Sequence, residues 1–193
     1  MTFNAIPLLL LADLVADLPA AVRLQRLVGS LRAHFHCGAV ALLKLEEEHL
    51  RPIAVDGLSS DALGRRFAVK DHPRLAAILQ RQGVTCFHHD STLPDPYDGL
   101  IEEHAGEPMP VHDCMGLPLD VEGGRWGVVT LDALEVGTFD AQAQRDLGAL
   151  ACVIEAAVRI TRLEAEVRAL RLSRGPTPLG THSPREESDI VGQ

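Results

Sequence analysis

Apolar side chains follow two different spacings in the first third of the chain. At 19–36 they recur every third or fourth position, which predicts an amphipathic helix with one apolar stripe. The stripe consists of Val22, Leu24, Leu27, Leu31 and Phe35. Two apolar runs follow at 39–45 and 50–55, on either side of the polar segment 46–48. We interpret them as two strands joined by a short polar turn.

Turn-forming residues organise the middle of the chain. Asp71 can cap a helix and Pro73 is tolerated in a first turn, so a helix is expected from there to about Arg81. A short strand is predicted at 84–87. The segment 90–99 is dense in aspartate, proline and glycine, which predicts a long loop.

Two further strands are predicted to pair across a glycine-containing turn. A loop made of the two glycines alone would set Met115 against Asp132, whereas a three-residue loop at 122–124 sets Met115 against Leu131 and matches the apolar faces. We therefore predict the three-residue loop. This register also places Cys114 directly opposite Asp132.

A long helix is predicted from near Phe139 to Leu172, and it carries a heptad seam. The seam consists of Ala149, Val153, Ala156, Ile160, Leu163, Val167 and Leu170. Its first half could equally pack on its own domain, but beyond about residue 160 a partner helix is favoured. We therefore expect self-association through this C-terminal helix.

The order of these elements predicts an α+β fold with a central antiparallel sheet flanked by helices and a long C-terminal helix. This order resembles a GAF-type sensory domain, in which one sheet face holds a ligand pocket. We expect residues 1–160 to form the sensory domain and 161–172 to form a helical, coiled-coil extension. Residues 173–193 are rich in glycine, proline, serine and charge, which predicts a flexible linker.

Composition excludes several classes of function. The chain has 18 basic and 27 acidic residues, a formal net charge of −9, which argues against direct nucleic-acid contact. Its two lysines, Lys44 and Lys70, do not follow a glycine, so the chain has no phosphate-binding loop of the P-loop ATPases. Its apolar runs are too short to span a membrane, and its N-terminus lacks the basic start of a signal peptide. Together with four scattered cysteines, these features predict a cytoplasmic protein without a membrane partner.

Five side chains could carry chemistry. Asp95 and Asp98 are three residues apart in a loop stiffened by two prolines. His112 and Cys114 are two residues apart on a strand and therefore share a face, and Asp132 is predicted opposite Cys114.

This mixture of ligand types restricts the metal that it could bind. Structural zinc prefers four thiolate or imidazole ligands, and magnesium and calcium prefer oxygen alone. Carboxylates with an imidazole and an open position resemble non-haem ferrous iron sites, where a diatomic gas can bind. Each motif alone also has an ordinary interpretation as a turn, a packed thiol or a strand-end aspartate. Only their convergence supports a metal site.

Several stretches resemble the N-terminal regulatory domain of the NorR family, the nitric-oxide-responsive, sigma-54-dependent transcriptional activators. They include D-S-x-L-P-D-P-Y-D-G-L-I at 90–101, V-H-x-C-x-G-L-P-L at 111–119, T-L-D at 130–132 and H-P-R-L at 72–75. The resemblance implies a GAF domain that holds one mononuclear non-haem Fe(II), binds nitric oxide and controls a following AAA+ ATPase domain. It implies no enzymatic activity for this chain itself.

The implied iron environment consists of Asp95, Asp98, His112, Cys114 and Asp132, with Arg74 also implicated. A guanidinium has no free lone pair, so we expect Arg74 to fix a carboxylate or to stabilise the nitric-oxide-bound state. The family also has an arginine in this helix that communicates with the ATPase domain, and either Arg81 or Gln80 stands near that position. The last residues, 188–193, resemble the start of an AAA+ domain, which is expected elsewhere in the same protein.

Two alternatives remain open at this point. Some GAF domains resemble free-methionine-sulfoxide reductases, for which Cys86 and Cys114 would be the nucleophile and resolving cysteine. The other alternative is a metal-free module that binds a small molecule or a cyclic nucleotide, or that only dimerises.

Overall fold

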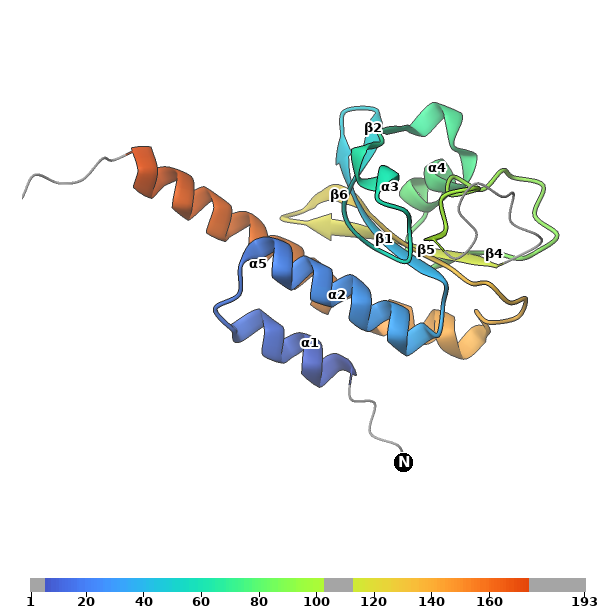
Figure 1. The fold of residues 1–193 in the computed structure, drawn as a ribbon, viewed down its shortest axis with the longest axis horizontal. Coiled ribbons are helices and arrows are strands. Elements are labelled where there is room, and N and C mark those ends of the chain that lie inside the picture. The colour runs from blue at the N-terminus through green and yellow to red at the C-terminus, as the bar shows by residue number, and fades with distance from the viewer. Residues whose placement is uncertain (1–5, 103–112, 174–193) are drawn as a thin grey trace, which may run out of the picture.

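The computed structural model describes residues 6–102 and 113–173, which form a six-stranded antiparallel sheet between two layers of helices (Figure 1). The strand order is β3-β2-β1-β6-β5-β4. The elements, in chain order, are α1 (Ile6–Val15), α2 (Ala20–Phe35), β1 (Ala39–Glu46), β2 (His49–Asp56), α3 (Asp61–Gly64), β3 (Phe67–Ala68), the 3-10 helix η1 (Val69–Asp71), α4 (Pro73–Gln80), β4 (Thr85–Phe87), β5 (Cys114–Val121), β6 (Gly124–Asp132) and α5 (Ala141–Ser173). The predicted α+β fold with an antiparallel sheet and a long C-terminal helix is confirmed.

Both faces of the sheet are buried, so the described residues form two hydrophobic cores. Helices α2 and α5 cover one face, with α1 packed against these two helices, and α3, α4 and the loop after β4 cover the other face (Figure 1). Side chains alternate between these cores along each strand. In β5, Met115 joins the core beneath the long helices, while Cys114 joins the core beneath α4.

The β5–β6 hairpin has the predicted central register but a different turn. Cys114 pairs with Asp132 and Met115 pairs with Leu131, as the apolar pattern predicts. The three-residue loop is wrong. The turn contains only Glu122 and Gly123, both with positive φ (54° and 80°), and a register shift between Leu119 and Asp120 takes up the extra residue. A two-residue turn with two positive φ angles matches the twist of the strands, and a bulge then restores the register.

Helix α1 has no counterpart in the predicted elements. Its sequence is apolar on all sides, so it shows no helical period, and only Ile6, Leu10 and Asp13 are buried in it. It lies against α2 and α5. A buried arginine of α2, Arg23, bonds to groups from or beside the other two helices. Its guanidinium donates to the backbone oxygens of Asp13 and Ala16 (both 3.2 Å) and to both carboxylate oxygens of Glu164 (2.7 and 2.9 Å).

Helix α5 runs from Ala141 to Ser173, close to the predicted limits, and buries a stripe different from the heptad seam. The buried residues are Leu147, Leu150, Ile154, Ala157 and Val158. On the seam, Leu163, Val167 and Leu170 are 39%, 45% and 60% exposed. The second half of the seam is therefore available for contacts outside this chain's own core. In the part of the chain that the structure describes, no helix is both long and apolar enough to cross a membrane.

Gly127 allows β6 to approach β1 closely, and its replacement tests this packing. Gly127→Ala is expected to lower the free energy of unfolding by about 2 kcal/mol, since overpacking forces neighbouring atoms to shift. A Cβ at this position would lie 2.0 Å from the backbone oxygen of Leu43, and backbone in a paired strand cannot move aside cheaply. Urea unfolding followed by circular dichroism measures the change.

Gly124→Ala, in the same strand, is the matched control because a Cβ there meets no atom within 4 Å. Equal unfolding free energies for the two variants would show that the close approach at Gly127 does not matter.

Candidate metal centre

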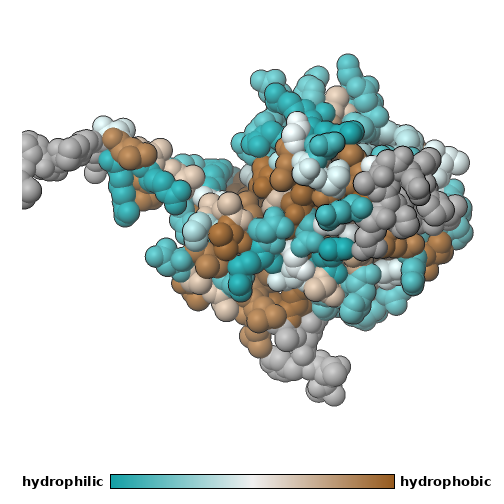
Figure 2. Space-filling model, viewed as in Figure 1, coloured by the Kyte–Doolittle hydropathy of each residue, from teal (hydrophilic) through white to brown (hydrophobic). Residues whose placement is uncertain are grey.

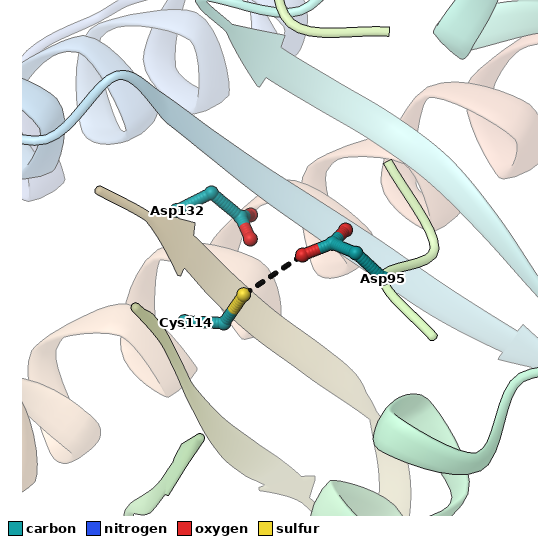
Figure 3. A group of neighbouring side chains, drawn as sticks. All are labelled: Asp95, Cys114 and Asp132. Atoms are coloured by element: carbon teal, nitrogen blue, oxygen red, sulfur yellow. Dashed lines mark hydrogen bonds between the residues drawn. The ribbon is translucent and has the colours of Figure 1, made fainter. Parts of the chain in front are cut away.

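Four side chains converge beneath α4 from four separate parts of the chain. Cys114 is the first residue of β5, and Asp132 is the last residue of β6. Asp95 comes from the loop between β4 and β5, and Arg74 comes from the first turn of α4. One ligand atom from each of Asp95, Cys114 and Asp132 lies within 4.8 Å of the others, and their side chains point toward one another (Figure 3).

These side chains are buried and bonded to one another. The Cys114 thiol donates to Oδ2 of Asp95 over 2.8 Å. Nη1 of Arg74 donates to the same oxygen (2.9 Å) and to the Cys114 sulfur (2.6 Å). Asp132 is 2% exposed and the Asp95 side chain is 6% exposed. Two carboxyl groups and a thiol therefore share a volume that excludes water.

The loop that carries Asp95 is held by its own short contacts. Oδ1 of Asp95 accepts a hydrogen bond from the backbone N–H of Tyr97 (2.7 Å), the local bond by which aspartate stabilises turns. The Tyr97 hydroxyl lies 2.8 Å from the Thr130 hydroxyl, on β6. The Tyr97 ring also packs edge-on against Phe67. Tyr97 is 1% exposed, so this loop is anchored in the core directly beside the site.

The surroundings disfavour an additional negative charge. Burial, followed by the charges of Asp132 and Asp95, raises the pKa of the Cys114 thiol far above its ordinary value. Burial likewise raises the pKa of the Tyr97 hydroxyl. A dication offsets such a cluster of negative and ionisable groups, and sulfur with carboxylate oxygen suits a transition metal better than magnesium or calcium. The donor set therefore fits a divalent transition metal such as iron.

A small cavity lies against Cys114 and Asp132. Its walls include the apolar side chains of Leu75, Ile78 and Phe87. The space inside is about 10 Å³, which is roughly what one water-sized molecule needs. Two larger grooves of the described surface lie elsewhere, along the outer side of α4 (about 700 Å³) and beside the C-terminal half of α5 (about 640 Å³).

The structure does not bring every candidate residue into this group. Asp98 is exposed on the loop, outside the cluster of Asp95, Cys114 and Asp132. His112 lies outside the described residues. Arg81 and Gln80 are both exposed at the C-terminal end of α4.

Asp113 is an important residue that the sequence analysis passed over. It is 1% exposed, and its carboxylate accepts hydrogen bonds from the backbone N–H groups of His89 (3.0 Å) and Gly137 (2.6 Å). Its backbone oxygen accepts from Ala133 (2.9 Å). It therefore joins the segments that follow β4 and β6 immediately beside the site. One sequence feature could have identified it: Asp113 occupies a position between Val111 and Met115 at which the alternation of apolar and polar residues predicts an apolar side chain.

The two cysteines of the reductase alternative face opposite sides of the sheet. Cys86 pairs with Met115 and packs with the core beneath the long helices, whereas Cys114 packs with the core beneath α4. Burial and the nearby Asp113 also raise the pKa of Cys86 to about 11. This arrangement does not favour thiol exchange between Cys86 and Cys114, since the two sulfurs must meet for a disulfide to form.

Solved structures with the same fold belong to several kinds of protein. The GAF domain of a phosphoenolpyruvate-protein phosphotransferase from Coxiella burnetii aligns with a TM-score of 0.66 at 19% identity, over 86% of this chain and 99% of that one. A free methionine-R-sulfoxide reductase from Neisseria meningitidis aligns with a TM-score of 0.61 at 16% identity, over 83% and 90%. At these identities the likeness concerns the fold alone.

Sequence comparison gives much higher identities. The chain is 70% identical over 184 residues to the nitric oxide reductase transcription regulator NorR1 of Cupriavidus necator, covering 95% of this chain and 36% of the relative. It is 42% identical to the anaerobic nitric oxide reductase transcription regulator NorR of Serratia proteamaculans, over 93% of this chain and 35% of the relative. The chain thus spans about a third of the length of these relatives, whose names describe regulators of transcription.

A family-level comparison agrees with the fold and with these relatives. The model of the GAF domain matches residues 20–158, which include all six strands, α2 and the buried half of α5. The chain belongs to the GAF domain family.

Proposed function

We propose that this chain is the nitric-oxide-sensing regulatory domain of a sigma-54-dependent transcriptional activator, with one mononuclear non-haem Fe(II). The observation that carries the proposal is the convergence of Asp95, Cys114 and Asp132 within 4.8 Å beside a cavity for one small molecule. The relatives named as nitric oxide reductase transcription regulators support the same role. The domain would turn over no substrate.

Asp95, Cys114 and Asp132 would hold the iron, and the family resemblance adds Asp98 and His112. A ferrous ion with an open position binds nitric oxide directly. The chain's own residues restrict what else enters. Leu75, Ile78 and Phe87 form an apolar wall that suits a small neutral gas, and the cavity of about 10 Å³ is too small for a sulfoxide-bearing amino acid or a cyclic nucleotide.

Helix α4 offers a route from this site to a partner domain. Its inner side carries Arg74 to the site, and its outer side, with Ala77 and Leu79, lines the groove of 700 Å³. Gln80 lines the same groove, and Arg81 follows it directly. We propose that the AAA+ ATPase domain of the same protein binds at this groove and that nitric oxide weakens this contact by shifting the population of two conformations.

The apolar surface of the terminal helices supports self-association. Figure 2 shows apolar patches over α1 and along the projecting end of α5, and Leu8 and Leu9 on α1 are 54% and 58% exposed. Contiguous exposed apolar surface of this kind marks an interaction site. We propose that two copies pair along the heptad seam of α5, with 1–160 as the sensory domain, 161–172 as the extension and 173–193 as the linker to the ATPase domain.

Metal loading tests the iron proposal. Protein loaded anaerobically with Fe(II) should give a paramagnetic resonance signal on addition of nitric oxide. Cys114→Ser and Asp132→Ala should each weaken iron binding by about 100-fold or more, because each removes a proposed ligand and outer-shell changes alone cost about 10–100-fold. Iron is measured by metal analysis after gel filtration, and circular dichroism checks that each variant is folded.

Cys152→Ser is the matched control because Cys152 is exposed on α5. Unchanged iron content in both site variants would remove these residues as ligands. Thiol-dependent turnover of methionine sulfoxide by metal-free protein, lost in Cys86→Ser, would instead favour the reductase alternative.

Self-association is tested at the exposed half of the seam. The double variant Leu163→Glu, Val167→Glu is expected to weaken dimerisation by about tenfold or more, because pairing would bury unpaired charges. Sedimentation equilibrium measures the dissociation constant. Ala165→Glu is the control, since Ala165 is exposed on α5 but lies off the seam. A monomeric wild-type chain, or equal effects in both variants, would contradict pairing along this seam.

A further inference from the structure

The guanidinium of Arg74 lies among the very atoms that a metal ion would use. A single nitrogen, Nη1, donates to Oδ2 of Asp95 (2.9 Å) and to the sulfur of Cys114 (2.6 Å). The neighbouring Nε donates to the backbone oxygen of Leu93 (2.8 Å). The guanidinium carbon lies 5.5 Å from the centre of the Phe87 ring, and the residue is 7% exposed. Arg74 is thus a buried cation held in one position by four contacts.

Arginine can only donate hydrogen bonds and keeps its proton at any ordinary pH, so it cannot itself become a metal ligand. Its charge is also fixed. A dication bound to Cys114 and Asp95 would lie within a few ångströms of this guanidinium, in a volume with little water to screen the two cations from one another. Nη1 already occupies Oδ2 of Asp95 and the sulfur of Cys114, so an ion that binds both of these atoms would compete with the guanidinium for them.

We propose that Arg74 is an internal counter-cation that competes with the metal ion, so that the guanidinium and the ion bind Asp95 and Cys114 in alternation. This inference rests on the metal site proposed above. It differs from a role in which Arg74 orients Asp95 for the metal. An orienting partner strengthens metal binding, whereas a competing cation weakens it.

Competition at this place would connect metal binding to the protein surface. Arg74 is in the first turn of α4, and Leu93 belongs to the loop that carries Asp95. Displacing the guanidinium from Asp95 therefore changes the contact between α4 and that loop. The outer side of the same helix lines the groove of 700 Å³, so loading of the site would alter this surface without any direct contact between the ion and the groove.

The affinity of Arg74 variants for Co²⁺ decides between the two roles. Arg74→Gln removes the charge and keeps a long polar side chain. If the guanidinium and the ion exclude one another, the variant should bind Co²⁺ at least about tenfold more tightly than the wild type, because the ion no longer has to displace a cation. Arg74→Lys keeps a cation and should stay near the wild-type affinity. An orienting role predicts binding about 10–100-fold weaker in Arg74→Gln. Anaerobic titration calorimetry measures the dissociation constants.

Arg66→Gln is the matched control, because Arg66 is 59% exposed and pairs with Glu46 away from the site. Tighter binding by Arg74→Gln alone supports competition. Weaker binding by Arg74→Gln, with a wild type that binds Co²⁺, overturns competition and leaves the proposed metal site intact. If neither the wild type nor Arg74→Gln binds Co²⁺, the metal site itself is wrong.

A measurement on the wild-type protein covers the case in which Arg74→Gln fails to fold. The Nε–H of Arg74 should exchange slowly with solvent, since it is buried and bonded to Leu93. Zn²⁺ should accelerate this exchange, detected by nuclear magnetic resonance of the arginine side chains, if the ion displaces the guanidinium. Unchanged protection at saturating Zn²⁺ would overturn the proposal.

Discussion

The antiparallel pairing of β5 with β6 determines which side chains reach the site. Cys114 begins one strand and Asp132 ends the other, and their pairing sets both side chains on the face beneath α4. A slip of one residue would send Cys114 to the same face as Met115, under the long helices. The two-residue turn and its bulge therefore matter to the site, although they lie at the far end of the hairpin. The rest of the site, Asp95 and Arg74, is built onto this strand pair.

The apolar alternation was sufficient to predict the strand pair, because both faces of the sheet are buried and a wrong register would expose apolar side chains. The same pattern could not reveal the bulge, since Leu119 and Asp120 look regular in sequence. Helix α1 was missed for a related reason. A segment that is apolar on every side carries no period from which a helix could be read.

The sequence predicts the candidate site only where the spacing along one strand, or the pairing of two strands, fixes the relative positions of the side chains. Cys114 and Asp132 meet these conditions. The loop motif identified Asp95 as a candidate, but it did not fix where that side chain lies. Asp98 belongs to the same motif as Asp95, but the structure buries Tyr97 between them and leaves Asp98 exposed, which the spacing alone does not indicate. Asp113 shows the converse case. The backbone N–H groups of His89 and Gly137, both 24 residues away, donate to its carboxylate, and the sequence around Asp113 does not identify these donors.

The contacts of the buried Arg23 bear on where this folded domain begins and ends. Its guanidinium donates to the backbone oxygens of Asp13, in α1, and Ala16, directly after α1, and to both carboxylate oxygens of Glu164. The family match, 20–158, excludes Asp13 and Ala16 of the first group as well as Glu164. The end of α1 and the C-terminal half of α5 therefore bond to the same guanidinium. A chain cut to residues 20–158 would keep the buried Arg23 but lose these four hydrogen-bond acceptors, so the folded unit extends beyond the family match on both sides.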